Sequence, residues 1–216
     1  MQSNTIFVTL GHMSRNRFSL AVALAVGCLA LSCRSAPSPQ QQPVAAMAPQ
    51  DAFWSELQAL CGRAFAGRLT EGSPGDSVFR GAELTMHVRR CTPTEIRIPF
   101  HAGANRSRTW VLTRTEAGLR LKHDHRHMDG TEDSVTQYGG DTRDAGSATR
   151  QEFYADAHTA TLIPAARTNV WTVEVAPAGA RFAYALRREG TDRRFRVEFY
   201  TGKPVAPPPA PWGAEP

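Results

Sequence analysis

Hydrophobic and polar residues alternate along most of the chain between residues 84 and 200, which is the pattern of half-buried β-strands. This period of two predicts strands over residues 84–88, 95–100, 108–115, 119–127, 134–138, 150–155, 169–175, 181–188 and 193–200. The last three of these segments have the clearest one-sided apolar stripes, Trp171/Val173/Val175, Phe182/Tyr184/Leu186 and Phe195/Val197/Phe199. Turns such as Glu116-Ala117-Gly118 are short, so neighbouring strands are expected to pair antiparallel.

One helical pattern precedes the strands. Asp51 is a suitable N-cap, and apolar residues follow it at helical spacing, namely Phe53, Trp54, Leu57, Leu60 and Cys61. Gly62 and Gly67 weaken any continuation of this helix. The predicted fold is therefore all-β and mainly antiparallel, a meander β-barrel or a sandwich of about 8–10 strands with a short N-terminal helix. Gly139-Gly140-Asp141 is interpreted as a turn.

The N-terminus has the composition of an export signal. Arg15 and Arg17 precede an almost entirely apolar run over residues 18–32, which is short for a membrane span. Residues 1–32 are therefore interpreted as a signal peptide, whose start is either Met1 or Met13. Removing them takes away two basic residues and no acidic one, so the formal charge falls from +5 to +3. That is an ordinary charge for solubility, and no nucleic-acid partner is expected.

The apolar run ends in Leu29-Ala30-Leu31-Ser32-Cys33, which resembles a bacterial lipobox. The resemblance implies lipidation at Cys33 and anchoring of the protein in a membrane through the lipid. Because Arg34 rather than aspartate follows the cysteine, similarity to enteric lipoproteins implies the outer membrane. The alternatives are secretion with cleavage near Ala36 and lipidation at Cys28.

Two segments flank the expected folded domain. Residues 33–50 are rich in Pro, Gln and Ala and are interpreted as a disordered tether, and residues 204–216 as a Pro-rich tail. The β-domain is therefore expected to span residues 51–203. Outside the signal it contains two cysteines, Cys61 and Cys91, and in an oxidising compartment the expectation for such a pair is a disulfide. A reactive thiol pair or a metal site is the alternative, without Cys-x-x-Cys spacing in its favour.

The main site candidate is a row of histidines. His123, His125 and His127 occupy alternate positions of one predicted strand, so they face the same side as Leu119 and Leu121. The apolar row thus becomes polar toward one end of the strand, beside the acidic loop 129–133.

A divalent metal could bind to part of this row. Alternate residues lie about 6.6 Å apart and zinc–nitrogen bonds are about 2.1 Å long, so two of the histidines can share an ion but three in a straight row cannot. Another ligand would have to come from elsewhere, with Glu132, Asp133, Glu152 and His158 as candidates. Two other interpretations remain open: a polar cavity mouth or exposed strand end, which we favour, and a cavity in which the histidines bind an organic ligand. Apart from such a metal, no cofactor is expected.

Two weaker features concern charge and exposure. Arg187-Arg188 and Arg193-Arg194 flank a hairpin loop and form a basic patch. The patch would suit an anionic envelope ligand, but a solvated edge that discourages strand pairing is favoured. His87 and His101 alternate with apolar residues and are expected at the surface.

The segment Phe53-Trp54-x-x-Leu57-x-x-Leu60-Cys61-Gly62, together with the sequence Leu-Lys-His-Asp-His-Arg-His over residues 121–127, resembles uncharacterised bacterial lipoproteins. The resemblance covers most of residues 51–200 and implies no activity. Barrels of the lipocalin type are similar in architecture only. We therefore expect a non-enzymatic envelope protein that binds a small ligand or an envelope partner. A metal-binding protein or metal-dependent enzyme and a purely structural envelope protein are the alternatives.

Overall fold

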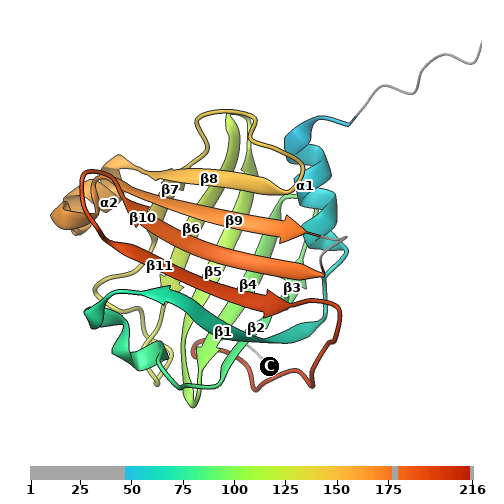
Figure 1. Cartoon of the computed structure of the whole chain (residues 1–216), viewed down its shortest axis with the longest axis vertical. Helices are drawn as coiled ribbons and strands as arrows, with labels where there is room; N and C mark the ends of the chain where they lie inside the picture. Colours follow the sequence, from blue (N-terminus) through green and yellow to red (C-terminus); the bar gives the residue numbers. More distant parts are fainter. Residues whose placement is uncertain (1–46, 177–179, 215–216) are drawn as a thin grey trace, which may run out of the picture. The chain divides into compact units, whose positions relative to one another are not determined.

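The computed structural model describes residues 47–176 and 180–214, which belong to one compact unit. Within this part of the chain there are eleven β-strands and two α-helices (Figure 1). The strands are β1 (Ala64–Gly72), β2 (Leu84–His87), β3 (Arg90–Cys91), β4 (Glu95–Ala102), β5 (Asn105–Thr115), β6 (Gly118–His125), β7 (Tyr138–Asp141), β8 (Arg150–Ala155), β9 (Asn169–Ala176), β10 (Arg181–Arg188) and β11 (Arg194–Tyr200). The helices are α1 (Pro49–Gln58) and α2 (Ala157–Leu162), with 3₁₀ turns η1 (Pro74–Phe79) and η2 (Pro164–Ala166).

Ten of these strands close into an antiparallel barrel. Strands β4 to β11 pair in chain order, β1 pairs with β11, and β2 pairs with both β1 and β4. The remaining strand, β3, pairs with β4 alone. In Figure 1 the strands of the near wall cross those of the far wall at a steep angle, as strand tilt in a closed barrel requires. The predicted all-β fold is confirmed, and the barrel is the architecture observed.

The barrel interior is formed by the predicted apolar stripes. Trp171, Phe182 and Phe199 are almost completely buried, and Val173, Tyr184 and Val197 on the same stripes are buried as well. A stack of three rings runs across the interior: the Trp110 ring centroid lies 4.8 Å from that of Phe100 and 4.4 Å from that of Tyr184. Burying a large side chain of this kind stabilises the fold by roughly 1.5–3 kcal/mol, so the stripes are the main source of stability.

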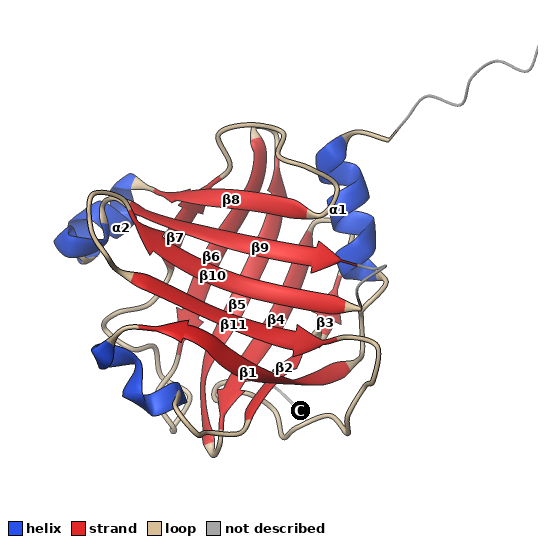
Figure 2. Ribbon diagram, viewed as in Figure 1, coloured by secondary structure: helices blue, strands red, loops and turns tan. Residues whose placement is uncertain are grey.

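Helix α1 packs against β8 and β9 (Figure 2). It buries Phe53, Trp54 and Leu57 in the core, as the helical spacing predicted. The helix begins two residues before the predicted cap, with Ala48 at the N-cap position. Asp51 instead lies in the first turn and forms an ion pair with Arg114 of β5. The prediction of Asp51 as the cap was wrong because the carboxylate binds an arginine rather than the helix N-terminus.

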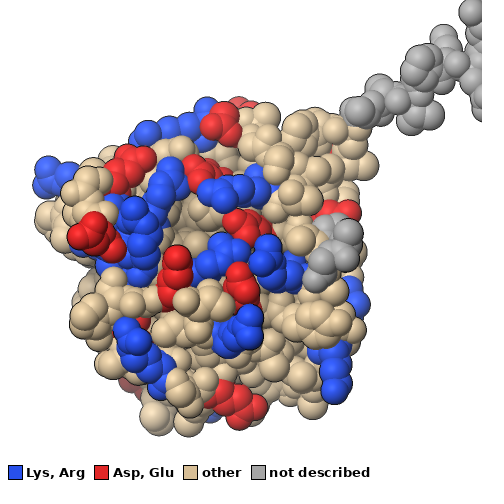
Figure 3. All heavy atoms as spheres, in the orientation of Figure 1, with Lys and Arg blue, Asp and Glu red and all other residues tan. Residues whose placement is uncertain are grey.

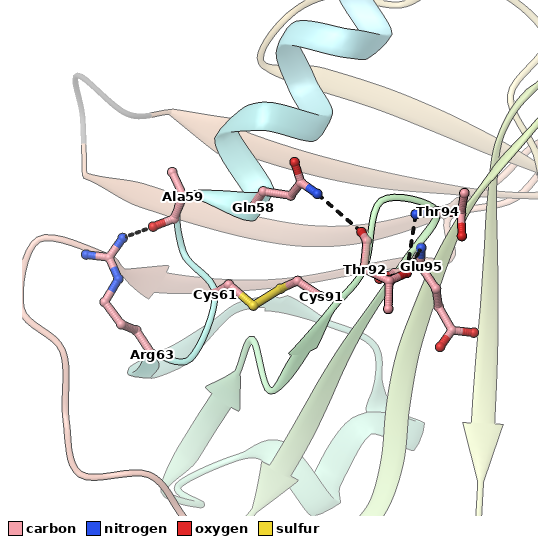
Figure 4. Close-up of a disulfide and its surroundings, with 8 residues drawn as sticks. All are labelled: Gln58, Ala59, Cys61, Arg63, Cys91, Thr92, Thr94 and Glu95. Atoms are coloured by element: carbon pink, nitrogen blue, oxygen red, sulfur yellow. Dashed lines mark hydrogen bonds between the residues drawn. A yellow bond between two sulfur atoms is a disulfide. The ribbon is translucent and has the colours of Figure 1, made fainter.

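The Cys61–Cys91 disulfide is confirmed (Figure 4). It links the segment that follows α1 to β3, across 30 residues of sequence. Beside it, Gln58 donates a side-chain hydrogen bond of 3.2 Å to the Thr92 carbonyl oxygen. The helix is thus fixed to the barrel by a covalent bond and by packing.

Three strands were not predicted, namely the two-residue strand β3 and the longer strands β1 and β7. Strand β1 includes Gly67, which lies opposite Phe199, and a Cβ at this position would overlap the Phe199 ring. Strand β7 contains Gly139-Gly140-Asp141, so the prediction of a turn was wrong. The prediction of a strand over residues 134–138 was also wrong, because residues 134–137 lie in a loop and β7 begins only at Tyr138. A Cβ at Gly140 would overlap the Tyr154 carbonyl oxygen of the neighbouring strand. In β1 and β7 glycine is required by close approach of a neighbour rather than by a turn.

The chain after β11 lies along the barrel. Val205 forms a β-bridge with Ala64, and the Trp212 amide donates a 3.1 Å hydrogen bond to the Arg106 carbonyl oxygen. His87 and His101 are buried, at 8% and 4% exposure. The expectation that they lie at the surface was wrong. The alternation placed them on the outer side of their strands, but it could not show what packs over that side.

Most charges on the outer face of β8–β11 are paired. Figure 3 shows basic and acidic side chains interspersed on this face. Arg150 and Arg196 both form ion pairs with Glu174, at 3.0 and 2.6 Å, and Arg187 pairs with Glu152 at 2.9 Å. Strands β10 and β11 each have a neighbour on both sides. The interpretation of their arginines as a solvated sheet edge was therefore wrong, because a closed barrel has no edge here.

Candidate functional site

A pocket opens at one mouth of the barrel, on the side where β6 and β10 end and β9 and β11 begin (Figure 1). We call it the mouth pocket. Its volume is about 300 Å³, at the lower end of the range for small-molecule sites. The strands contribute Phe100, Arg108, Trp110, His123, His125, Tyr138, Asn169, Trp171, Tyr184, Leu186, Arg188 and Phe195. The turns and loops around the mouth contribute Asp76, Phe79, Val135, Ile163, Ala166 and Arg193.

His123 forms part of the inner wall of this pocket and is 3% exposed. Its Nδ1 lies 3.1 Å from the Tyr138 carbonyl oxygen, and its Nε2 lies 2.7 Å from the Tyr184 hydroxyl. A carbonyl oxygen can only accept, so Nδ1 carries the proton and Nε2 accepts from the Tyr184 O–H. The imidazole also stacks on the Tyr138 ring, with centroids 4.4 Å apart. Both ring nitrogens are therefore engaged within the fold.

His125 lies nearer the opening. Its Nε2 is 3.3 Å from the Tyr138 hydroxyl, and its backbone amide donates to Thr136 Oγ1 at 2.9 Å. Its partner on β5 is Arg108, whose side chain also lines the pocket. Strand β6 ends at His125 and His127 is exposed, so the inward row of the strand ends at His125.

Both histidines are neutral at neutral pH. Burial lowers the pKa of His123 to about 3, and the nearby His125 adds to this effect. Burial, together with the charge of Arg108, lowers the pKa of His125 to about 4. Burial also raises the pKa of Tyr138 to about 12, so its hydroxyl stays protonated. The polar groups of the inner pocket therefore offer hydrogen bonds and carry no charge.

The other predicted site residues do not reach the pocket. His127 lies beyond the end of β6, where its amide donates to the Thr131 carbonyl oxygen at 2.9 Å. Glu132 forms an ion pair with Arg126 at 3.0 Å. One Asp133 carboxylate oxygen accepts the Val135 amide at 2.9 Å. The prediction that His127 continues the inward row was wrong, because the strand ends two residues earlier.

The two remaining candidate metal ligands are also elsewhere. Glu152 lies on β8 and pairs with arginines of the outer face, and His158 is exposed on α2. Among the residues that the structure describes, no three His, Cys, Asp or Glu side chains come together in a group able to hold a metal ion. An ion bound at His123 would have to displace its hydrogen bond to Tyr138 or to Tyr184.

Several pocket residues were missed from the sequence, notably Arg108, Tyr138 and Asn169. The sequence did indicate the orientation of Arg108. It stands at every second position with Trp110 and Leu112 on one strand, so the three side chains face the same side, the interior. Tyr138 was predicted at the end of a strand but was not connected with the histidines. Its position depends on the pairing of β7 with β6, which sets Tyr138 opposite His123.

Cys33, the residue predicted to be lipidated, lies outside the described residues, as do the predicted signal peptide and most of the tether. None of the helices in the described part of the chain has the length and apolar character needed to cross a membrane. Comparison with protein-family models, with curated proteins and with solved structures finds no match for this chain.

Proposed function

We propose that this chain is a membrane-anchored envelope protein whose barrel binds a small, largely apolar molecule in the mouth pocket. The observation that carries the proposal is the composition of that pocket. Flat aromatic side chains form its walls, and a few polar groups converge on it, including the His125 ring and the Tyr138 hydroxyl. This combination of an apolar cavity with a small number of placed polar groups is typical of small-molecule sites.

The rigidity of the walls supports this proposal. Trp110 is stacked between Phe100 and Tyr184, and Trp171 lies 5.3 Å from the His123 ring centroid. These side chains are held by neighbours on other strands, so the cavity exists before a ligand arrives. A preformed site avoids the entropic cost of ordering its walls on binding.

Anchoring is supported by the lipobox-like sequence ending at Cys33 and by the polar tether that follows it. In this proposal the lipid holds the barrel at the outer membrane, and the domain acts as a carrier or sensor rather than an enzyme.

The proposal is tested by calorimetric titration of the full-length chain with naphthamide, a neutral molecule with two fused aromatic rings. We expect a dissociation constant in the range of about 1 µM to 1 mM. Val135 lines the opening and is 40% exposed, so Val135→Trp should narrow the opening without disturbing the core. Tyr200→Trp is the control, because Tyr200 is 60% exposed at the end of β11 far from the pocket.

We expect Val135→Trp to weaken naphthamide binding at least tenfold and Tyr200→Trp to leave it unchanged. Absence of binding to the wild-type chain, or equal binding to both variants, would contradict the proposal.

A further inference from the structure

We propose, resting on the function above, that the natural ligand of the mouth pocket is an amphipathic carboxylate whose anionic group pairs with Arg108. Its flat apolar body would occupy the space between the aromatic walls. The inference comes from the arginines of the pocket, which differ from the other arginines of the barrel in what surrounds them.

Inward-facing rows on three strands end in an arginine at this mouth. Each row is apolar within the barrel and then places a guanidinium group at the opening. The rows are Leu112/Trp110/Arg108 on β5, Tyr184/Leu186/Arg188 on β10 and Phe195/Arg193 at the start of β11. The barrel closure therefore gathers three cationic side chains around one opening, although they are far apart in sequence.

One of the three is neutralised within the fold. Arg193 forms a bidentate ion pair with Asp76, at 2.5 and 2.7 Å. Asp76 is 6% exposed and is the only carboxylate in the pocket lining among the described residues. This pair adds no net charge to the pocket lining.

Arg108 forms no hydrogen bond or ion pair with a carboxylate among the described residues, and the Asp133 carboxylate acts on it only through space. Its Nη1 donates to Asn105 Oδ1 and Ser107 Oγ, both at 3.2 Å, and its guanidinium lies 5.1 Å from the Phe79 ring centroid. Within the same part of the chain, Nε and Nη2 make no hydrogen bond. Two donors of a half-buried guanidinium are therefore available to a ligand.

Arg188 is similar. Its Nε donates to Asn169 Oδ1 at 2.9 Å, and it forms no ion pair with a described residue. The arginines of the outer face differ from it, because Arg150, Arg187 and Arg196 each pair with glutamates. With the two histidines neutral, the pocket lining has an excess of positive charge.

Burying the Arg108 guanidinium group without a bonded carboxylate costs free energy. Burial lowers the pKa of Arg108 by more than the charge of Asp133 raises it, which means that the folded protein still disfavours the charged form of Arg108. A buried charge is stabilised by a partner of opposite charge, and guanidinium groups bind carboxylates with matched, paired donors. A ligand that supplies a carboxylate would therefore give Arg108 the ion pair that it does not form in the free protein.

The size of the pocket sets the size of the ligand. A cavity of about 300 Å³ is roughly twice as large as one that accommodates benzene. The flat aromatic side chains of Trp110, Tyr138 and Trp171, which line the pocket, favour a planar body. An aromatic acid with two fused rings meets both conditions.

The test compares naphthoate with naphthamide, which has the same shape and no charge. Calorimetric titrations use the full-length chain and two variants. Arg108→Met keeps an apolar stem beside Phe79 and removes the charge. Arg181→Gln is the control, since Arg181 lies on the outer face at the far end of β10 and pairs with Glu198.

We expect the wild-type chain and Arg181→Gln to bind naphthoate about tenfold or more tightly than naphthamide, because a hydrogen bond to a charged group is worth that factor. In Arg108→Met the preference should disappear, while the melting temperature of the free protein should not fall. If Arg108 served only the fold, Arg108→Met would weaken the binding of naphthoate and naphthamide equally, and that result would overturn the inference.

The outcomes separate this inference from the proposed function. Equal binding of naphthoate and naphthamide to the wild-type chain overturns the charge assignment and leaves the pocket as a ligand site. A naphthoate preference that persists in Arg108→Met shows that Arg108 is not the partner. If neither compound binds, the proposed function and the inference fail together.

Discussion

Acidification should destabilise the barrel through His123, and the size of the effect can be worked out from its surroundings. The imidazole lies among Tyr138, Trp171 and Tyr184, with His125 and Arg108 toward the opening. Burial lowers its pKa from 6.5 to about 3. The unfolded chain therefore takes up a proton at this residue below about pH 6.5, whereas the folded chain does not until about pH 3.

The stability contributed by a neutral His123 is fully present above about pH 6.5 and is progressively lost as the pH falls toward the lowered pKa of the folded state. Between about pH 7.5 and about pH 5 one such group reduces the free energy of unfolding by about 2 kcal/mol. Burial also lowers the pKa values of His125 and His101 to about 4. The stability that these two neutral side chains contribute is therefore likewise lost as the pH falls.

The assay is urea unfolding of the wild-type chain and of His123→Gln at several pH values. The glutamine variant should be less stable throughout, but its loss of stability between about pH 7.5 and about pH 5 should be smaller by about 2 kcal/mol. His158→Gln is the control, because His158 is exposed on α2, and it should follow the wild type. An identical pH dependence in the wild type and His123→Gln would refute the reasoning.

Three further predictions concern the fold and the anchor. Cys91→Ser should lower the free energy of unfolding, measured in urea titrations, by about 3–4 kcal/mol, because the disulfide no longer closes a loop in the unfolded chain. A reductant should lower the free energy of unfolding of the wild type by the same amount and leave that of Cys91→Ser unchanged. Gly140→Ala should cost about 3 kcal/mol or more because its Cβ overlaps Tyr154, whereas Gly75→Ala, in open space, should change the melting temperature little. Cys33→Ser should move the protein from the membrane to the soluble fraction, and retention in the membrane would contradict lipidation at Cys33.

The alternation of side chains predicted most of the barrel because each long strand has one buried face. Strands β8 and β10 begin and end where the stripes indicated. The choice between barrel and sandwich depends on the pairings of β1 with β11 and of β2 with β4. These pairings join segments that are distant in sequence, and alternation within a strand contains no information about the partner strand.

The candidate site was predicted in part. His125 was placed correctly at the polar end of an inward row. The arginines on both sides of the turn between β10 and β11 were recognised as a cluster, and two of them, Arg188 and Arg193, line the pocket. Their relation to one another could not be predicted, because it requires the closed ring of strands. Once the order of strands around the barrel is known, Arg108 and Arg188, which each follow an inward-facing row, are placed at the same opening. Asp76 was beyond sequence reasoning, since it reaches the mouth from a 3₁₀ turn outside the sheet.

The central claim, that the barrel mouth binds a small amphipathic molecule, is tested most directly by titrating naphthoate into the wild-type chain and into Val135→Trp. Near neutral pH, where burial keeps His123 and His125 uncharged, we predict saturable binding of one naphthoate per wild-type chain. We predict binding at least tenfold weaker in Val135→Trp. No binding to the wild type, or binding that a tryptophan at the opening leaves unchanged, would contradict the account.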